Sequence, residues 1–320
     1  MIGVILNPNA LGVTRDRRLA ERLRRALGDA GEMAVTRTPA DVRDAVERFA
    51  QAGVELVASC GGDGTNLSTV TELVRRFGPE RLPRFAVLRG GTVNTVAENL
   101  GVRGRPDEIL ARIVERRRRG ETLEVGQDLI EVLGPSPKDG AGPNGRDSGQ
   151  FGFLFAAAMG ARFLEAYYGG PLTGVAWATA LAIRTATSTL LSGPLARWLF
   201  DPLEVSLTAD GEPMPIDHVR LLLAATIPSV GIGMKVTWQA GAQPNRFHLI
   251  ASALPLPSMA LQLPRVLAGE PLAGQPHVDR LVRELHARFV VPQTFTLDGE
   301  LFREREVRIR VGPRLWVVKP

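Results

Sequence analysis

Apolar runs alternate with amphipathic stretches along the first third of the chain. Residues 1–6 form a short apolar run that stops at Asn7-Pro8, and leucines then recur at helical spacing beneath an arginine-rich face up to residue 27. The same alternation predicts strands over residues 33–35, 54–59 and 85–88, and helices over residues 40–52, 65–76, 95–100 and 107–118. Such alternation is typical of βαβ units, so we predict a parallel sheet that binds ligands outside the carboxyl ends of its strands.

The pattern changes after about residue 122 to short apolar runs broken by glycine and proline. These runs predict strands over residues 129–133, 152–159, 203–209, 219–226, 247–253 and 293–297, with a helical stretch over residues 172–200 inserted. Residues 134–150 hold eight glycines and prolines and predict a loop. We therefore expect a mainly β, sandwich-like second region.

The length of 320 residues suits two domains. We predict an α/β domain over residues 1–122 and a β-rich domain over residues 123–305. The chain end, residues 306–320, is expected to pack back on the first domain.

Composition and charge narrow the class of protein. Hydrophobic residues make up 44% and charged residues 23% of the chain, as in folded globular proteins. The net charge of +5 comes with arginine clusters that lack aromatic interleaving and zinc-ligand spacing, so no nucleic-acid partner is expected. One cysteine, Cys60, and an opening without an apolar leader favour the cytoplasm.

The most apolar stretch, residues 175–191, is short for a bilayer span and contains Arg184. It predicts a helix that is buried in the core or lies in a bilayer interface, and we favour the core. The oligomeric state is left open, with a dimer as one alternative.

Two glycine-rich loops follow predicted strands. The segment SCGGDGTNLS, residues 59–68, places glycines around Asp63, and LRGGTVNTVA, residues 88–97, repeats the arrangement. Glycines let backbone N–H groups approach a phosphate, and a carboxylate among them suggests a divalent cation between the two. The alternative is a plain turn in which Asp63 caps the next helix.

These motifs resemble the diacylglycerol kinase and sphingosine kinase catalytic family, which is related to the NAD kinases and 6-phosphofructokinases. GGDGT at residues 61–65 and GGT at residues 90–92, followed by Asn94, match two family motifs, and the late LDGE at residues 297–300 matches a third. Asn7-Pro8 matches the opening of the family, and residues 231–235 match its second-domain glycine motif.

The resemblance implies an ATP-dependent, Mg²⁺-requiring kinase that phosphorylates a hydroxyl of a diacylglycerol- or sphingoid-type lipid. Its first domain would bind the nucleotide, and its β-rich domain would bind the lipid at a membrane surface, with peripheral contact at the inner face. The implied nucleotide contacts are Asn7, Thr36, Gly61, Gly62, Asp63, Gly64, Thr65, Asn66, Leu67, Ser68, Gly91, Thr92 and Asn94. The implied general base is Glu300, with Asp298 beside it, and the implied metal ligands are Asp63 and Glu124.

The sequence departs from the family in three places. Asp-Gly-Glu occurs twice, at residues 210–212 and 298–300, and Asp-Gly is also a common hairpin turn; we favour the second copy as the site. Ser68 stands where relatives carry glutamate, and Thr95 where they carry aspartate. Two alternatives therefore stay open: an NAD kinase-like enzyme with a soluble substrate, and a non-catalytic lipid- or nucleotide-binding relative.

Overall fold

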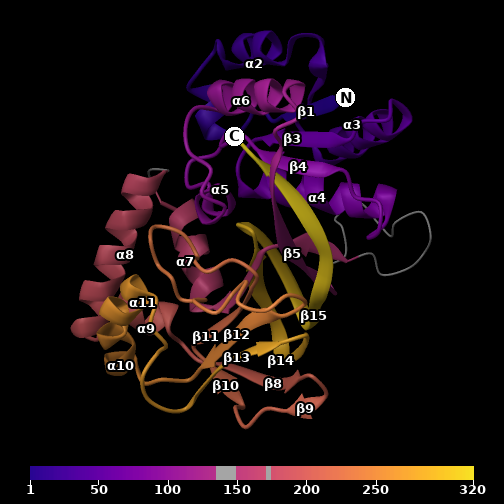
Figure 1. The fold of residues 1–320 in the computed structure, drawn as a ribbon. Coiled ribbons are helices and arrows are strands. Elements are labelled where there is room, and N and C mark those ends of the chain that lie inside the picture. The colour runs from indigo at the N-terminus through magenta and orange to yellow at the C-terminus, as the bar shows by residue number, and fades with distance from the viewer. Residues whose placement is uncertain (135–148, 171–173) are drawn as a thin grey trace. The chain divides into compact units, whose positions relative to one another are not determined.

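The computed structural model describes residues 1–134, 149–170 and 174–320, which divide into two compact units (Figure 1). Unit 1 contains Met1–Leu129 together with Pro313–Pro320, and unit 2 contains Ile130–Gly312. The loop predicted over residues 134–150 lies almost entirely outside the described residues. The end of the chain thus returns to the unit in which the chain begins.

Unit 1 is built on a parallel sheet with the strand order β4-β3-β1-β2. Its strands are β1 (Ile2–Leu6), β2 (Gly31–Val35), β3 (Leu56–Cys60) and β4 (Arg84–Val87). The end of β15 (Glu300–Lys319) lies parallel to β4, with Val317 opposite Phe85. All residues of β1 and β3 are buried. Because the strands run in parallel, the loops that follow them leave the sheet at one common edge.

Helices pack in pairs on this sheet. They are α1 (Leu11–Thr14), α2 (Leu19–Leu27), the 3₁₀ turn η1 (Gly28–Ala30), α3 (Pro39–Gln51), α4 (Asp63–Phe77), α5 (Thr95–Asn99) and α6 (Pro106–Arg118). Helix α2 contacts α6, and α3 contacts α4 (Figure 1). The predicted helices begin within two residues of the observed ones. One difference matters: α4 begins at Asp63 rather than at residue 65, so the glycine motif itself forms the N-terminus of the helix.

Unit 2 is mainly β and its strand pairs are antiparallel. Its strands are β5 (Leu123–Leu133, which begins in unit 1), β6 (Gln150–Gly152), β7 (Leu154–Ala158), β8 (Leu203–Ala209), β9 (Glu212–Pro213), β10 (His218–Val219), β11 (Leu221–Ala225), β12 (Phe247–Ser252), β13 (His277–Val282), β14 (Glu284–Leu297) and β15. Strand β14 pairs first with β8 and then with β7, from which the sheet continues through β11, β12 and β13. The predicted fold class, an α/β region with a parallel sheet followed by a mainly β region, is confirmed.

The sequence pattern missed β13, the first half of β14 and all of β15. In β15, the buried residues Val307 and Ile309 alternate with the exposed Arg308 and Arg310. This alternation is typical of a strand with one buried and one solvent-exposed face. The many charged residues in the segment lower its hydrophobicity, so the apolar pattern alone did not indicate a strand.

Five helices belong to unit 2: α7 (Met159–Tyr168), α8 (Val175–Leu190), α9 (Pro194–Leu199), α10 (Leu256–Leu261) and α11 (Leu263–Ala268). Helix α8 buries Ala178 and Leu181 but exposes Ile183 and Leu190, so only one of its sides is core, which corrects the preference for a core helix. No helix in the part of the chain that the structure describes is long and apolar enough to cross a bilayer.

Candidate functional site

Three glycine-containing segments of unit 1 lie against one another at the carboxyl ends of the strands. A Cβ atom on Gly91 would stand 2.5 Å from the Cα atom of Gly62, and one on Gly90 would stand 2.7 Å from the amide nitrogen of Gly61. A Cβ atom on Gly12, in the short helix α1 that follows the β1 loop, would stand 2.6 Å from the carbonyl oxygen of Gly90. Only glycine allows backbones to approach this closely. The two glycine loops predicted from the sequence therefore form one backbone surface, to which the unpredicted Gly12 contributes.

The side chain of Asp63 links the loop after β3 to the loop after β4. Its carboxylate accepts hydrogen bonds from the backbone N–H groups of Thr95 (2.9 Å) and Val96 (3.2 Å) at the N-terminus of α5. Burial raises the pKa of this carboxyl above its ordinary value, against the opposing effect of the two N–H donors. The alternative that Asp63 caps the helix directly after it is thus wrong: α4 begins at Asp63 itself, and the carboxylate binds the first N–H groups of α5 instead.

The opening Asn7 joins the same surface. Its Nδ2 donates to Thr65 Oγ1 at 2.9 Å, and its backbone N–H donates to the carbonyl of Cys60. The predicted proximity of Asn7 to the GGDGT loop is therefore present in the structure. Cys60, at the end of β3, is fully buried, which raises the pKa of its thiol to about 12, so it is no nucleophile at neutral pH.

In the part of the chain that the structure describes, three buried polar atoms around these loops have no hydrogen-bond partner. They are Thr36 Oγ1, Ser59 Oγ and Asn66 Oδ1, at the end of β2, near the end of β3 and in the first turn of α4. An unpaired buried polar atom costs about 1–3 kcal/mol, which a bound ligand or water that supplies the missing partner would recover. Thr36 and Asn66 were predicted as nucleotide contacts, whereas Ser59 was missed.

The remaining predicted nucleotide contacts differ in what they offer a ligand. Asn94 closes its own loop, since its side chain accepts from the Gly91 N–H and donates to the Gly91 carbonyl, both at 2.9 Å. Leu67 is buried and offers a ligand no accessible side chain. Thr92 and Ser68 are half-buried and stay accessible. Asn94 therefore shapes the loop, and Thr92 is the side chain in it that can reach a ligand.

Glu124, the second predicted metal ligand, lies in a different environment. It forms an ion pair with Arg84 at 3.0 Å, at the amino end of β4, whereas the glycine loops follow the carboxyl ends of β3 and β4. Among the described residues, no group of three or more His, Cys, Asp or Glu side chains could hold a metal ion. The structure thus does not bring Glu124 to Asp63, and a shared metal site remains only a prediction.

Both Asp-Gly-Glu copies form two-residue hairpin turns in unit 2. Asp298 and Gly299 connect β14 to β15 with φ angles of 46° and 90°, and Asp210 and Gly211 connect β8 to β9 with φ angles of 52° and 86°. Positive φ at both central residues is typical of a type I′ turn. Local conformation therefore does not distinguish the preferred copy from the other.

Both turn aspartates bind the backbone of a neighbouring strand. Asp298 is 4% exposed and accepts from the N–H groups of Phe153 and Leu154, at 2.9–3.1 Å. Asp210 accepts in the same way from Arg283 and Glu284, at 2.8 and 2.9 Å. Because its oxygens are occupied by N–H donors, Asp298 acts as an anchor for its turn. This corrects the expectation that it shares the chemistry of Glu300.

Glu300 follows this anchored turn. It is the first residue of β15, opposite Leu297, and it is exposed. The Tyr168 hydroxyl donates to the carbonyl of Gly299 at 3.0 Å, which adds a second tie to the turn. The preferred copy therefore presents an accessible carboxylate on a backbone that is held from two sides.

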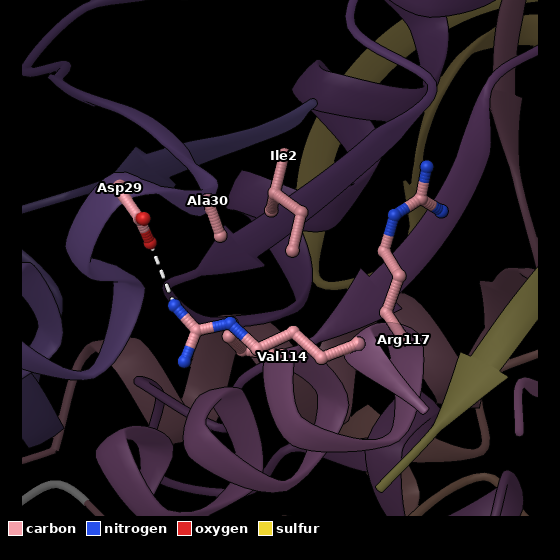
Figure 2. A pocket seen from close by; sticks show the side chains of 6 residues that line it. Ile2, Asp29, Ala30, Val114 and Arg117 are labelled. Carbon is pink, nitrogen blue, oxygen red and sulfur yellow. Dashed lines mark hydrogen bonds and ion pairs between the residues drawn. The ribbon is translucent and has the colours of Figure 1, made fainter. Parts of the chain in front are cut away.

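A separate pocket of about 290 Å³ lies in unit 1 near the amino end of β1. It is lined by Ile2, Asp29, Ala30, Val114, Arg117 and Arg118 (Figure 2). Asp29 and Arg118 neutralise each other across 2.6 Å. Because ligands of parallel sheets bind at the carboxyl ends of the strands, this pocket is not the candidate site.

Comparisons with known proteins agree with the family resemblance. Residues 1–126 match the model of the diacylglycerol kinase catalytic domain, so the resemblance predicted from the glycine loops is confirmed for this part of the chain. A comparison with curated protein sequences finds no match.

Solved structures share the fold of the whole chain. Two structures of a "putative diacylglycerol kinase" from Bacillus anthracis str. Sterne match all of this chain, and 95% and 97% of theirs, each with a TM-score of 0.71 and 15% sequence identity. A third, of a diacylglycerol kinase from the same organism, matches all of this chain and 96% of its own, with a TM-score of 0.63 and 14% identity. At this identity the likeness shows the fold alone.

Proposed function

We propose that this chain is an ATP-dependent lipid kinase that phosphorylates a hydroxyl of a diacylglycerol- or sphingoid-type lipid. The observation that carries the proposal is the packing of the two glycine loops at the carboxyl ends of β3 and β4. These loops lie within residues 1–126, the part that matches the diacylglycerol kinase catalytic domain. We expect the enzyme to work in the cytoplasm, at the surface of the membrane that holds its substrate.

The backbone surface of unit 1 suits a triphosphate. At the start of α4 the backbone N–H groups of Thr65 and Asn66 donate to the Gly62 carbonyl, so those of Asp63 and Gly64 are the ones left for a phosphate, and Gly62 and Gly64 carry no side chains to block its approach. Thr36 and Asn66 offer unpaired polar atoms beside this surface. A nucleotide would satisfy both the N–H groups and these atoms.

Magnesium fits this site as a companion of the nucleotide. Mg²⁺ is usually bound by one or two carboxylates together with substrate phosphates and water. Asp63 is the carboxylate that the loops supply, and it already accepts two N–H donors. When bound, the ion would neutralise charge on the phosphate oxygens.

Glu300 is the proposed general base. A lipid hydroxyl is a weak nucleophile, and a carboxylate that accepts its proton makes the oxygen a better one. Asp298 and Tyr168 would hold the turn that carries Glu300. We assign proton transfer to Glu300 and positioning to these two residues.

Thr36→Val should lower the affinity for ATP about five- to tenfold without destabilising the protein. The substitution removes a buried hydroxyl that has no partner, so the free energy of unfolding should stay constant or rise slightly. Fluorescent-nucleotide titration and urea unfolding measure the two effects.

Thr69→Val is the matched control for this experiment. Thr69 Oγ1 is buried but donates to the Thr65 carbonyl at 2.7 Å, so its loss should cost about 0.5–1.5 kcal/mol of stability. Unchanged ATP affinity in Thr36→Val would remove Thr36 from the nucleotide site.

A labelled-ATP assay tests the proposed function. Purified protein is incubated with Mg²⁺ and mixed micelles containing diacylglycerol, monoacylglycerol, sphingoid base or ceramide, and separately with NAD without lipid. We expect label in a lipid phosphate and none in NAD. Transfer to NAD would favour the soluble-substrate alternative. Absence of transfer to every acceptor, with ATP still bound, would favour the non-catalytic one.

A further inference from the structure

Four helices of unit 2 form a packed group with an unusual surface. Helix α8 contacts α9 and α10, and α10 contacts α11, as Figure 1 also shows. These helices make up about a tenth of the chain, yet with the residue after α8 they carry eight of the seventeen large apolar side chains that are exposed among the described residues. The most prominent are Ile183, Leu190, Leu191, Trp198, Leu261 and Leu267. Apolar surface is thus concentrated on this helix group.

Helix α8 exposes large apolar side chains on its outer side. Its buried side contains Thr185 and Thr189 beside Ala178 and Leu181, while Ile183 and Leu190 are 63% and 68% exposed. An amphipathic helix in a water-soluble protein normally turns its apolar stripe to the core. Exposed leucine and isoleucine on the outer side therefore indicate a partner surface that is itself apolar.

The charge of the helix group has one sign. No Asp or Glu occurs between Glu165 and Asp201, or between Asp217 and Glu270, although roughly one residue in nine of the chain is acidic (34 of 320). Arg184 and Arg197 are exposed and have no ion-pair partner among the described residues. Arg265 on α11 contacts Glu270 at 3.6 Å. The partner surface is therefore expected to be anionic as well as apolar.

We propose that the helix group α8–α11 is the surface through which unit 2 enters the interface of an anionic phospholipid bilayer. Leucine side chains would reach the acyl boundary, the half-exposed Trp198 would lie at headgroup level, and the arginines would contact lipid phosphates. A second copy fits less well, because a two-fold contact would bring Arg184 and Arg197 of both copies together without acidic partners. This assignment rests on the proposed function in one respect, that a lipid kinase meets its substrate in a bilayer.

Vesicle flotation without ATP or any lipid substrate tests the assignment independently of catalysis. Wild-type protein should float with vesicles of phosphatidylcholine and phosphatidylglycerol. Leu190→Glu/Leu191→Glu should bind them at least tenfold more weakly, because two leucines that would be buried in the bilayer become charged. In Arg184→Gln/Arg197→Gln, the affinity for these vesicles should fall about fivefold per arginine. Its affinity for vesicles of phosphatidylcholine alone should change little.

The matched control is Val290→Glu/Val291→Glu, an adjacent apolar pair on β14 outside the helix group that is 56% and 55% exposed. It should bind anionic vesicles as wild type does. The assignment would be overturned if both double variants bound anionic vesicles equally weakly, or if the wild-type protein did not float with them. So would light scattering that shows a dimer dissociated by Leu190→Glu/Leu191→Glu. Phosphorylation of a water-soluble short-chain diacylglycerol, measured without vesicles, reports on the kinase proposal separately.

Discussion

Glu300→Gln is expected to slow phosphoryl transfer to a lipid hydroxyl by about 10²- to 10⁴-fold while ATP affinity stays constant. Glutamine keeps the shape of the side chain but cannot accept the proton of the attacking hydroxyl, and general-base catalysis contributes about this factor. Because Glu300 is exposed at the start of β15, we do not expect the substitution to disturb folding. Rates from labelled ATP at saturating lipid, with nucleotide titration beside them, measure both quantities.

The chain contains its own control for this prediction. Glu212 follows Asp210-Gly211 as Glu300 follows Asp298-Gly299, in the same turn conformation and with the same aspartate-to-backbone bonds. Glu212→Gln should leave the rate unchanged. A similar loss in both variants, or a normal rate in Glu300→Gln, would show that the second copy is not the catalytic one.

Gly91→Ala is expected to lower ATP affinity more than tenfold and to cost about 1–3 kcal/mol of stability. The new Cβ atom would stand 2.5 Å from Gly62 Cα, where the neighbouring atom is rigid backbone, so the two glycine loops must move apart. That movement would stretch the bonds from Asp63 to Thr95 and Val96. Nucleotide titration and urea unfolding measure the two losses.

Gly120→Ala separates loss of binding from loss of stability. Gly120 has a φ of 73° and no atom within 4 Å of its Cβ position, so alanine there is strained but touches neither loop. It should cost about 1 kcal/mol and leave ATP affinity constant. Wild-type ATP affinity in Gly91→Ala would mean that the loops do not form the nucleotide site.

The sequence predicted most of unit 1 because β1 to β4 and the longer helices each carry a local period. β1 and β3 are short apolar runs that end in turn residues, and α3 begins at Pro39 after Thr38, which forms a capping box with Asp41. The role of Asp63 was beyond such reasoning, since its partners lie 32 and 33 residues further along the chain. These hydrogen bonds follow from the packing of the two loops, which no local period encodes.

Only part of the candidate site was predicted, because some of its contacts also depend on the folded chain. Asn7 and Thr65 were assigned to one site by resemblance, and the structure joins them by a hydrogen bond. Glu124 was assigned by its place in the sequence, but Arg84 pairs with it. The ion-pair partner of a charged surface residue depends on which side chains lie near it in the folded chain. Its place in the sequence therefore says little about that partner.

The sharing of β15 between the two units has a consequence for how the protein folds during synthesis. Val317, which pairs with Phe85 of β4, is synthesised long after Phe85, and Asp298 must appear before the N–H groups of Phe153 and Leu154 are satisfied. Contacts this distant in sequence form slowly and leave strand edges unpaired until they do. We therefore expect the edge of the sheet at β4 to stay unpaired in the nascent chain until the end of β15 has been synthesised.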